Sequence, residues 1–160
     1  MDLEDLKVYQ LAMLIGESCW TVVAKWDNFQ KDTIGKQLVR SADSIAANIS
    51  EGFGRYHYKE NKNFNFYARG SLFETRTWLV KAQTRKLISE TDFLKMKKDM
   101  SDLGYLINRY IKSIGSDQKL TEPEVEYGKN LSEDFLDLES IPFPDEKIII
   151  SLNDCFNDCF

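Results

Sequence analysis

The sequence has little of what several large classes of protein require. His57 is its single histidine, so a catalytic triad or a multi-histidine metal site could draw on only one imidazole. No apolar run approaches the roughly 20 residues of a membrane-spanning helix, and the opening MDLEDLK is acidic where a signal peptide is basic. We therefore expect a soluble, cytoplasmic protein with no membrane partner.

Cysteine and glycine are also too sparse or too scattered for familiar sites. The cysteines at positions 19, 155 and 159 form no paired framework, which fits a reducing compartment. Gly52 and Gly54 lack the third glycine and the Lys-Ser/Thr of a phosphate-binding loop, and no Glu-x-x-His motif of a dimetal bundle occurs. We expect no catalytic residue, no metal and no cofactor, and we interpret His57 as a surface residue, with a ligand contact as the alternative.

Proline is absent from the first 115 residues, and all three prolines lie in the last 45. The charge changes at the same place. Residues 1–115 hold 18 Lys and Arg against 14 Asp and Glu, a net +4, whereas residues 116–160 hold 3 against 12, a net −9. We expect one folded body over 1–115 and an acidic, largely irregular or flexible tail over 116–160.

Apolar residues recur at intervals of three and four, which predicts helices, and no segment shows the alternation of a half-buried strand. The expected helices cover roughly 3–26, 32–53 and 59–87, and a fourth ends at Gly115. The fourth has the most regular apolar seam, which consists of Phe93, Met96, Met100, Leu103, Ile107, Tyr110 and Ile114. The connections are short, so the sequence predicts an all-α, antiparallel, up-and-down four-helix bundle.

Polar residues near the expected helix starts suggest caps. Asp32 or Thr33 could cap the second helix, and Ser89 or Thr91 could cap the fourth. Within the second helix, the stretch RSADSIAANISEGFGR places polar side chains beside an apolar seam. Since buried polar groups need partners, we interpret these side chains as a structural polar network of Asp43, Asn48 and Glu51. We expect Asp43 or Glu51 to pair with an arginine on another helix or subunit.

The basic residues concentrate in the middle of the chain, where residues 31–87 hold 11 Lys and Arg against 5 Asp and Glu. Lys62, Arg69 and Arg76 recur every seven residues, so they lie on one stripe of the third expected helix, with Phe66 and Tyr67 alongside. A basic stripe with aromatic neighbours could hold phosphates and stack bases. The candidate nucleic-acid or partner-binding residues are Lys36, Arg40, Arg55, Lys59, Lys62, Arg69 and Arg76. The alternative is a solvated face with ion pairs to Glu60 and Glu74.

Three blocks occur in order along the chain: DLKVYQLA, RSADSIAANISEGFGR and ARGSLFE. Together they resemble the four-helix-bundle family encoded by intervening sequences of bacterial 23S ribosomal RNA genes, over about residues 3–114. The resemblance implies a ring, commonly a pentamer, without established catalytic activity. A related accessory protein of diversity-generating retroelements forms such a ring and partners a reverse transcriptase and nucleic acid. The resemblance also implies nucleic-acid or subunit contacts by Arg40, Arg55, Arg69 and Arg76, and helix-holding roles for Asn48, Glu51 and Gly70.

These observations favour a non-enzymatic, oligomeric protein that binds RNA or DNA through its basic face. The alternative is a protein-interaction scaffold or accessory subunit whose basic face binds a partner protein. A small enzyme that uses a carboxylate with His57 is the third hypothesis, and the sequence favours it least. Because the region 116–160 is acidic and tethered to a basic body, it could also cover the basic stripe.

Overall fold

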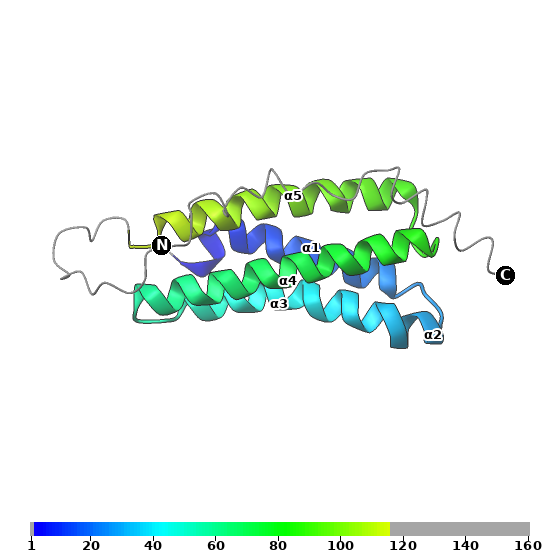
Figure 1. Cartoon of the computed structure of the whole chain (residues 1–160), viewed down its shortest axis with the longest axis horizontal. Coiled ribbons are helices and arrows are strands. Elements are labelled where there is room, and N and C mark those ends of the chain that lie inside the picture. The colour runs from blue at the N-terminus through cyan, green and yellow to red at the C-terminus, as the bar shows by residue number, and fades with distance from the viewer. Residues whose placement is uncertain (1, 116–160) are drawn as a thin grey trace, which may run out of the picture.

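The computed structural model describes residues 2–115, and its four long helices lie side by side along one axis (Figure 1). Each long helix packs against the next one along the chain, and the last also packs against the first. These helices are α1 (Lys7–Val23), α3 (Lys36–Phe53), α4 (Tyr58–Thr84) and α5 (Glu90–Ser113). The predicted all-α, up-and-down four-helix bundle is confirmed, and the predicted acidic tail, residues 116–160, lies outside the described residues.

Three short elements modify the first two expected helices. A 3-10 turn, η1 (Leu3–Asp5), precedes α1, so the first long helix is shorter than expected at both ends. A helical turn, α2 (Asn28–Gln30), and a π-helical turn, η2 (Lys31–Gly35), precede α3 without a break. The chain therefore starts winding before residue 32, the expected start of the second helix.

The helix that begins with α2 is capped by Asp27, not by Asp32 or Thr33. Asp27 Oδ1 accepts a hydrogen bond from the Gln30 backbone N at 2.8 Å, and Gln30 Oε1 accepts one from the Asp27 N at 3.3 Å. This reciprocal capping box satisfies two donors that the start of a helix leaves unpaired. Thr33 lies inside the winding, where its hydroxyl donates to the Phe29 carbonyl at 2.7 Å.

The start and end of α5 agree with the sequence. Ser89 Oγ accepts a hydrogen bond from the Asp92 backbone N at 3.1 Å, which confirms Ser89 as the cap. Gly115 has a φ of +71°, the left-handed conformation that commonly follows a helix end. The end of α5 lies beside the start of α4, since a Cβ on Gly115 would be 3.5 Å from the Tyr58 Cβ.

One apolar core runs through the bundle and receives side chains from all four long helices. Its fully buried members include Ile15, Leu38, Leu72 and Leu103. The fourth helix buries the seam that the sequence predicted, except that Tyr110 stays half-buried. Within residues 2–115, no helix combines the length and the apolar character that crossing a membrane requires.

Candidate nucleic-acid interface

The turn between α3 and α4, residues 54–57, presents cationic and aromatic side chains to solvent. Gly52 makes the turn tight, because a Cβ there would lie 3.0 Å from the Phe64 Cβ and 3.1 Å from the Asn61 carbonyl oxygen. Tyr56 is 92% exposed, and its ring meets the His57 ring edge-on at 5.0 Å between centroids. The turn thus offers an aromatic surface that a nucleobase could reach.

Arg55 is the cation of this turn. Its guanidinium pairs with Glu51, four residues earlier on α3, and lies 4.7 Å from the centroid of the Phe64 ring. A guanidinium over an aromatic face is attracted by the ring quadrupole and keeps part of its edge available for further hydrogen bonds. Lys59 is exposed one turn further along the chain, at the start of α4.

The predicted basic stripe continues along α4 toward α5. Arg69 Nη1 donates to Asn108 Oδ1 on α5 at 3.4 Å, and its guanidinium lies 5.0 Å from the Phe66 ring centroid. The guanidinium of Arg76 lies 5.6 Å from the Phe73 ring centroid. Burial lowers the pKa of both arginines, but a guanidinium stays charged at neutral pH because its ordinary pKa lies above 12.

Most of the predicted basic residues therefore share one surface, which we call the basic–aromatic face. It begins at the α3–α4 turn and follows one side of α4, since residues separated by three, four or seven positions lie on the same side of a helix. Its members on α4 are Tyr58, Lys59, Lys62, Phe66, Arg69 and Arg76, and we include the exposed Arg55 and Tyr56 of the adjoining turn, although Arg55 packs on Phe64, which lies on another side of α4.

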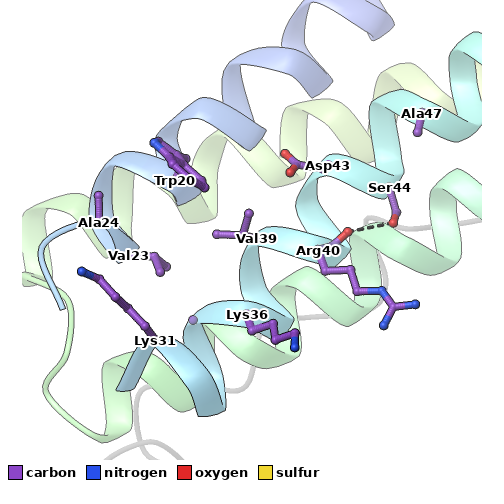
Figure 2. A pocket seen from close by; sticks show the side chains of 11 residues that line it. Trp20, Val23, Ala24, Lys31, Lys36, Val39, Arg40, Asp43, Ser44 and Ala47 are labelled. Carbon is purple, nitrogen blue, oxygen red and sulfur yellow. Dashed lines mark hydrogen bonds between the residues drawn. The ribbon is translucent and has the colours of Figure 1, made fainter. Parts of the chain in front are cut away.

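Two of the predicted basic residues, Lys36 and Arg40, lie elsewhere. Both line a groove of about 800 Å³ between α1 and α3 (Figure 2). The four helices pack in the cyclic order α1, α3, α4 and α5, so the interface between α1 and α3 lies on the opposite side of the bundle from the interface between α4 and α5. The structure thus separates these two cations from the basic–aromatic face.

Sequence reasoning did not assign Tyr56 and Tyr58 of the basic–aromatic face, nor a separate Tyr105–Arg109 pair on α5. Tyr56 and Tyr58 are 92% and 50% exposed, and the alternation of basic and aromatic residues in RYHYK was the available signal. On α5, the Arg109 guanidinium lies 5.6 Å from the Tyr105 ring centroid. The sequence could have indicated this contact, because Tyr105 and Arg109 are four residues apart and side chains at that spacing lie together on a helix.

The three residues of the predicted polar network make their described contacts within α3, with the turn that follows it, or with an acid of α1. Asn48 Nδ2 donates to the Ser44 carbonyl at 2.7 Å, and Glu51 pairs with Arg55 of the turn after α3. Burial and the charge of Glu17 on α1 raise the pKa of Asp43. Within residues 2–115, neither acid shows the expected pairing with an arginine of another helix, and pairing across subunits stays a prediction.

Other polar groups join the helices instead. Thr75 Oγ1 on α4 lies 3.1 Å from Ser41 Oγ on α3, and both side chains are buried. The Arg69–Asn108 bond joins α4 to α5 in the same way. Gly70, which the resemblance assigned to helix packing, is exposed, and a Cβ there would meet no atom within 4 Å. Gly70 therefore leaves a flat place on the surface of α4.

Within residues 2–115, no three His, Cys, Asp or Glu side chains gather as metal ligands would. The buried thiol of Cys19 has its pKa raised to about 12 by burial and by the charge of Asp43, so it carries almost no thiolate at neutral pH.

The fold defines the chain as a small four-helix-bundle protein. This chain belongs to the 23S rRNA-intervening sequence protein family, whose family model matches residues 4–109. That membership confirms the resemblance of the three sequence blocks. A comparison with curated proteins gave no match.

A solved structure from Bacteroides thetaiotaomicron is similar to this chain. It is described as a protein with unknown function from the S23 ribosomal protein family. The two are 23% identical with a TM-score of 0.62, and the match covers 66% of this chain and 96% of that chain. At this identity, the likeness concerns the fold.

Proposed function

We propose that this chain is a non-catalytic, cytoplasmic nucleic-acid-binding protein that holds RNA on its basic–aromatic face. The observation that carries the proposal is the arrangement of that face, where cations and exposed aromatic rings alternate from the α3–α4 turn along α4. Phosphates are held by cations and unpaired bases by aromatic rings, so both parts of a single-stranded RNA find partners on one surface.

Each group on the face has a definite part in this proposal. Lys59 and Lys62 neutralise phosphates as flexible point charges, whereas Arg55 and Arg69 are oriented by the rings beneath them. Tyr56 is the platform on which a base stacks, because its ring is almost fully exposed at the tip of the turn. Contacts of this kind bind RNA with little regard to sequence.

The proposal includes assembly into a ring, with five subunits as the expected number. Met13 and Leu14 support it, because they lie on α1 with 44% and 63% of their surfaces exposed. Apolar side chains clustered on a surface commonly mark contacts with another protein. A ring would repeat the basic–aromatic face around one axis, so one RNA could contact several subunits and gain avidity.

The test is binding of the full chain to a fluorescent RNA with unpaired loops, measured by anisotropy across a salt series, with particle mass determined in parallel. We expect affinity to fall with salt at a log-log slope of about 0.7–0.9 per neutralised phosphate. The variant Lys59→Gln/Lys62→Gln should lower that slope by about 1.5 per subunit that contacts RNA. Lys95→Gln/Lys98→Gln on α5 is the control with the same charge change, and its slope should match that of the original chain.

A second variant separates stacking from charge. Tyr56→Ser should cost about 1–3 kcal/mol of binding free energy with the salt slope unchanged, because it removes a stacking surface and no charge. Equal effects of the two lysine pairs would contradict the proposed location. If the full chain fails to bind at low salt, nucleic-acid binding is wrong, and the alternative of a protein partner on the same face takes its place.

A further inference from the structure

The groove between α1 and α3 has an apolar floor that no described residue covers. Trp20, Val23 and Ala24 line it from α1, and Val39 and Ala47 line it from α3. Figure 2 shows Trp20 and Val23 of α1 on one side of the groove and Val39 of α3 on the other. Trp20 is 62% exposed, although tryptophan side chains in folded proteins are on average highly buried. A concave apolar surface around an exposed tryptophan is suited to bind another group.

Cations border this floor. Lys31, Lys36 and Arg40 line the groove along η2 and the first turns of α3, and Lys36 and Arg40 are exposed. Asp43 lies beyond them toward Ala47 and is the acid among the lining residues. An occupant of this groove therefore needs apolar side chains for the floor and carboxylates for the end bordered by the cations.

The sequence of this chain contains a segment with that chemistry. Residues 133–143, EDFLDLESIPF, hold four carboxylates and no Lys or Arg. Five apolar residues are interleaved with these acids: Phe135, Leu136, Leu138, Ile141 and Phe143. The segment thus complements the groove in both charge and apolar side chains. A nucleic acid would supply negative charge and flat bases, but no aliphatic side chains for the apolar floor.

The segment is also long enough to reach the groove. The described chain ends at Gly115 beside Tyr58, at the end of the bundle where α3 finishes. Lys36 lies about 26 Å from that end, because α3 rises 1.5 Å per residue between Lys36 and Phe53. Residues 116–132 can span up to about 56 Å when extended, so the tether does not prevent docking.

We propose that residues 133–143 of this chain dock in its own α1–α3 groove. Their apolar side chains cover Trp20 and Val39, and their carboxylates face Lys31, Lys36 and Arg40. The tether keeps the segment at a high effective concentration near the groove, so modest contacts are enough to hold it. This inference does not depend on the nucleic-acid proposal, because the groove and the basic–aromatic face lie on opposite sides of the bundle.

Zero-length carbodiimide cross-linking of the full chain tests the proposal, since this reagent joins a lysine amine to a carboxylate only when the two are in contact. Peptide mapping should find Lys31 and Lys36 joined to acids of residues 133–139. The exposed lysines Lys95 and Lys98 on α5 should give at least about tenfold fewer links to that segment, because the tether alone gives no preference of this size. A mixture of ¹⁴N- and ¹⁵N-labelled chains should give links of uniform isotope composition.

A pair of tail variants supplies the matched control. Phe135→Ser/Leu138→Ser should lose the links to Lys31 and Lys36, whereas Leu120→Ser/Val125→Ser, which also removes two apolar residues, should keep them. The proposal would be overturned by equal links in both variants, by links spread over lysines according to their exposure, or by links of mixed isotope composition. A link from Lys36 to a carboxylate within residues 2–115 of another chain would assign the groove to a second copy and would also overturn it.

Discussion

Asp43 stands where α3 meets α1; the residue as a whole is exposed, but its carboxylate lies against Gly16 of α1. Partial desolvation there is the larger cause and the nearby Glu17 the smaller one, and both raise the pKa of Asp43 above its ordinary value of 3.8. Its Oδ1 lies 2.9 Å from the position that a Cβ on Gly16 would occupy, so the lack of a side chain at Gly16 makes room for the carboxylate. A raised folded-state pKa means that ionised Asp43 is less favourable in the folded chain than in the unfolded one.

The substitution Asp43→Asn should therefore stabilise the fold at neutral pH. The contribution of Asp43 to stability is fully present below its unfolded pKa of about 3.9 and is lost as the pH rises through the higher folded pKa. Urea unfolding at pH 7 should give the variant a larger free energy of unfolding than the original chain, and the difference should disappear near pH 3. Glu51→Gln is the control, because that acid pairs with a cation, Arg55, whereas Asp43 has another acid as its neighbour, and it should show no gain. A loss of stability in Asp43→Asn at pH 7 would contradict this reading.

At the scale of elements, α4 ends in a conformation that suits glycine but carries lysine. Lys86 has a φ of +58°. The Leu87 N donates to the Ala82 carbonyl at 2.9 Å, and the Lys86 N donates to the Gln83 carbonyl at 2.9 Å. This pair of bonds is the Schellman motif, in which the left-handed residue after the helix is usually glycine. The motif ends α4 and turns the chain toward α5, which runs antiparallel to it. The left-handed backbone conformation of Lys86 makes this turn energetically costly.

Replacing Lys86 with glycine should relieve that cost. A left-handed residue with a side chain costs about 1–2 kcal/mol, and the greater freedom of glycine in the unfolded chain offsets part of the gain. We expect Lys86→Gly to raise the free energy of unfolding by about 0.5–1 kcal/mol in chemical denaturation. Lys86→Ala removes the same charge but keeps the strained backbone, so it should give no such gain. Equal effects of the two substitutions would assign the change to charge.

At the scale of the whole molecule, the hydrophobic core closes within the described helices. Its buried cluster runs from Leu6 to Ile111 and draws on α1, α3, α4 and α5. Helices in such a bundle owe most of their stability to tertiary packing of their apolar faces. The packing partners of each long helix are therefore present without any residue beyond 115.

A chain that ends at Gly115 should consequently fold by itself. We expect the helical circular dichroism of the body to persist, with a single cooperative thermal transition. Its midpoint should lie within about 4–8 °C of the full chain, the shift that roughly 1 kcal/mol produces in a domain of about 100 residues. A broad transition without a clear midpoint would mean that residues 116–160 complete the core.

The sequence by itself determined the helices and the stripe of Lys62, Arg69 and Arg76, because each depends on the period of one helix. It also determined the bundle, because short connections bring successive helices together in antiparallel order. It missed the Asp27 cap, because Asp32 and Thr33 offered the same capping chemistry and only the winding from Asn28 distinguishes them. Tertiary structure decided the rest of the site. It placed Lys36 and Arg40 on the α1–α3 groove, and it gave the joining of helices to Ser41, Thr75, Arg69 and Asn108. These outcomes depend on how each helix is rotated against its neighbours, and that rotation is set by packing between segments far apart in the chain.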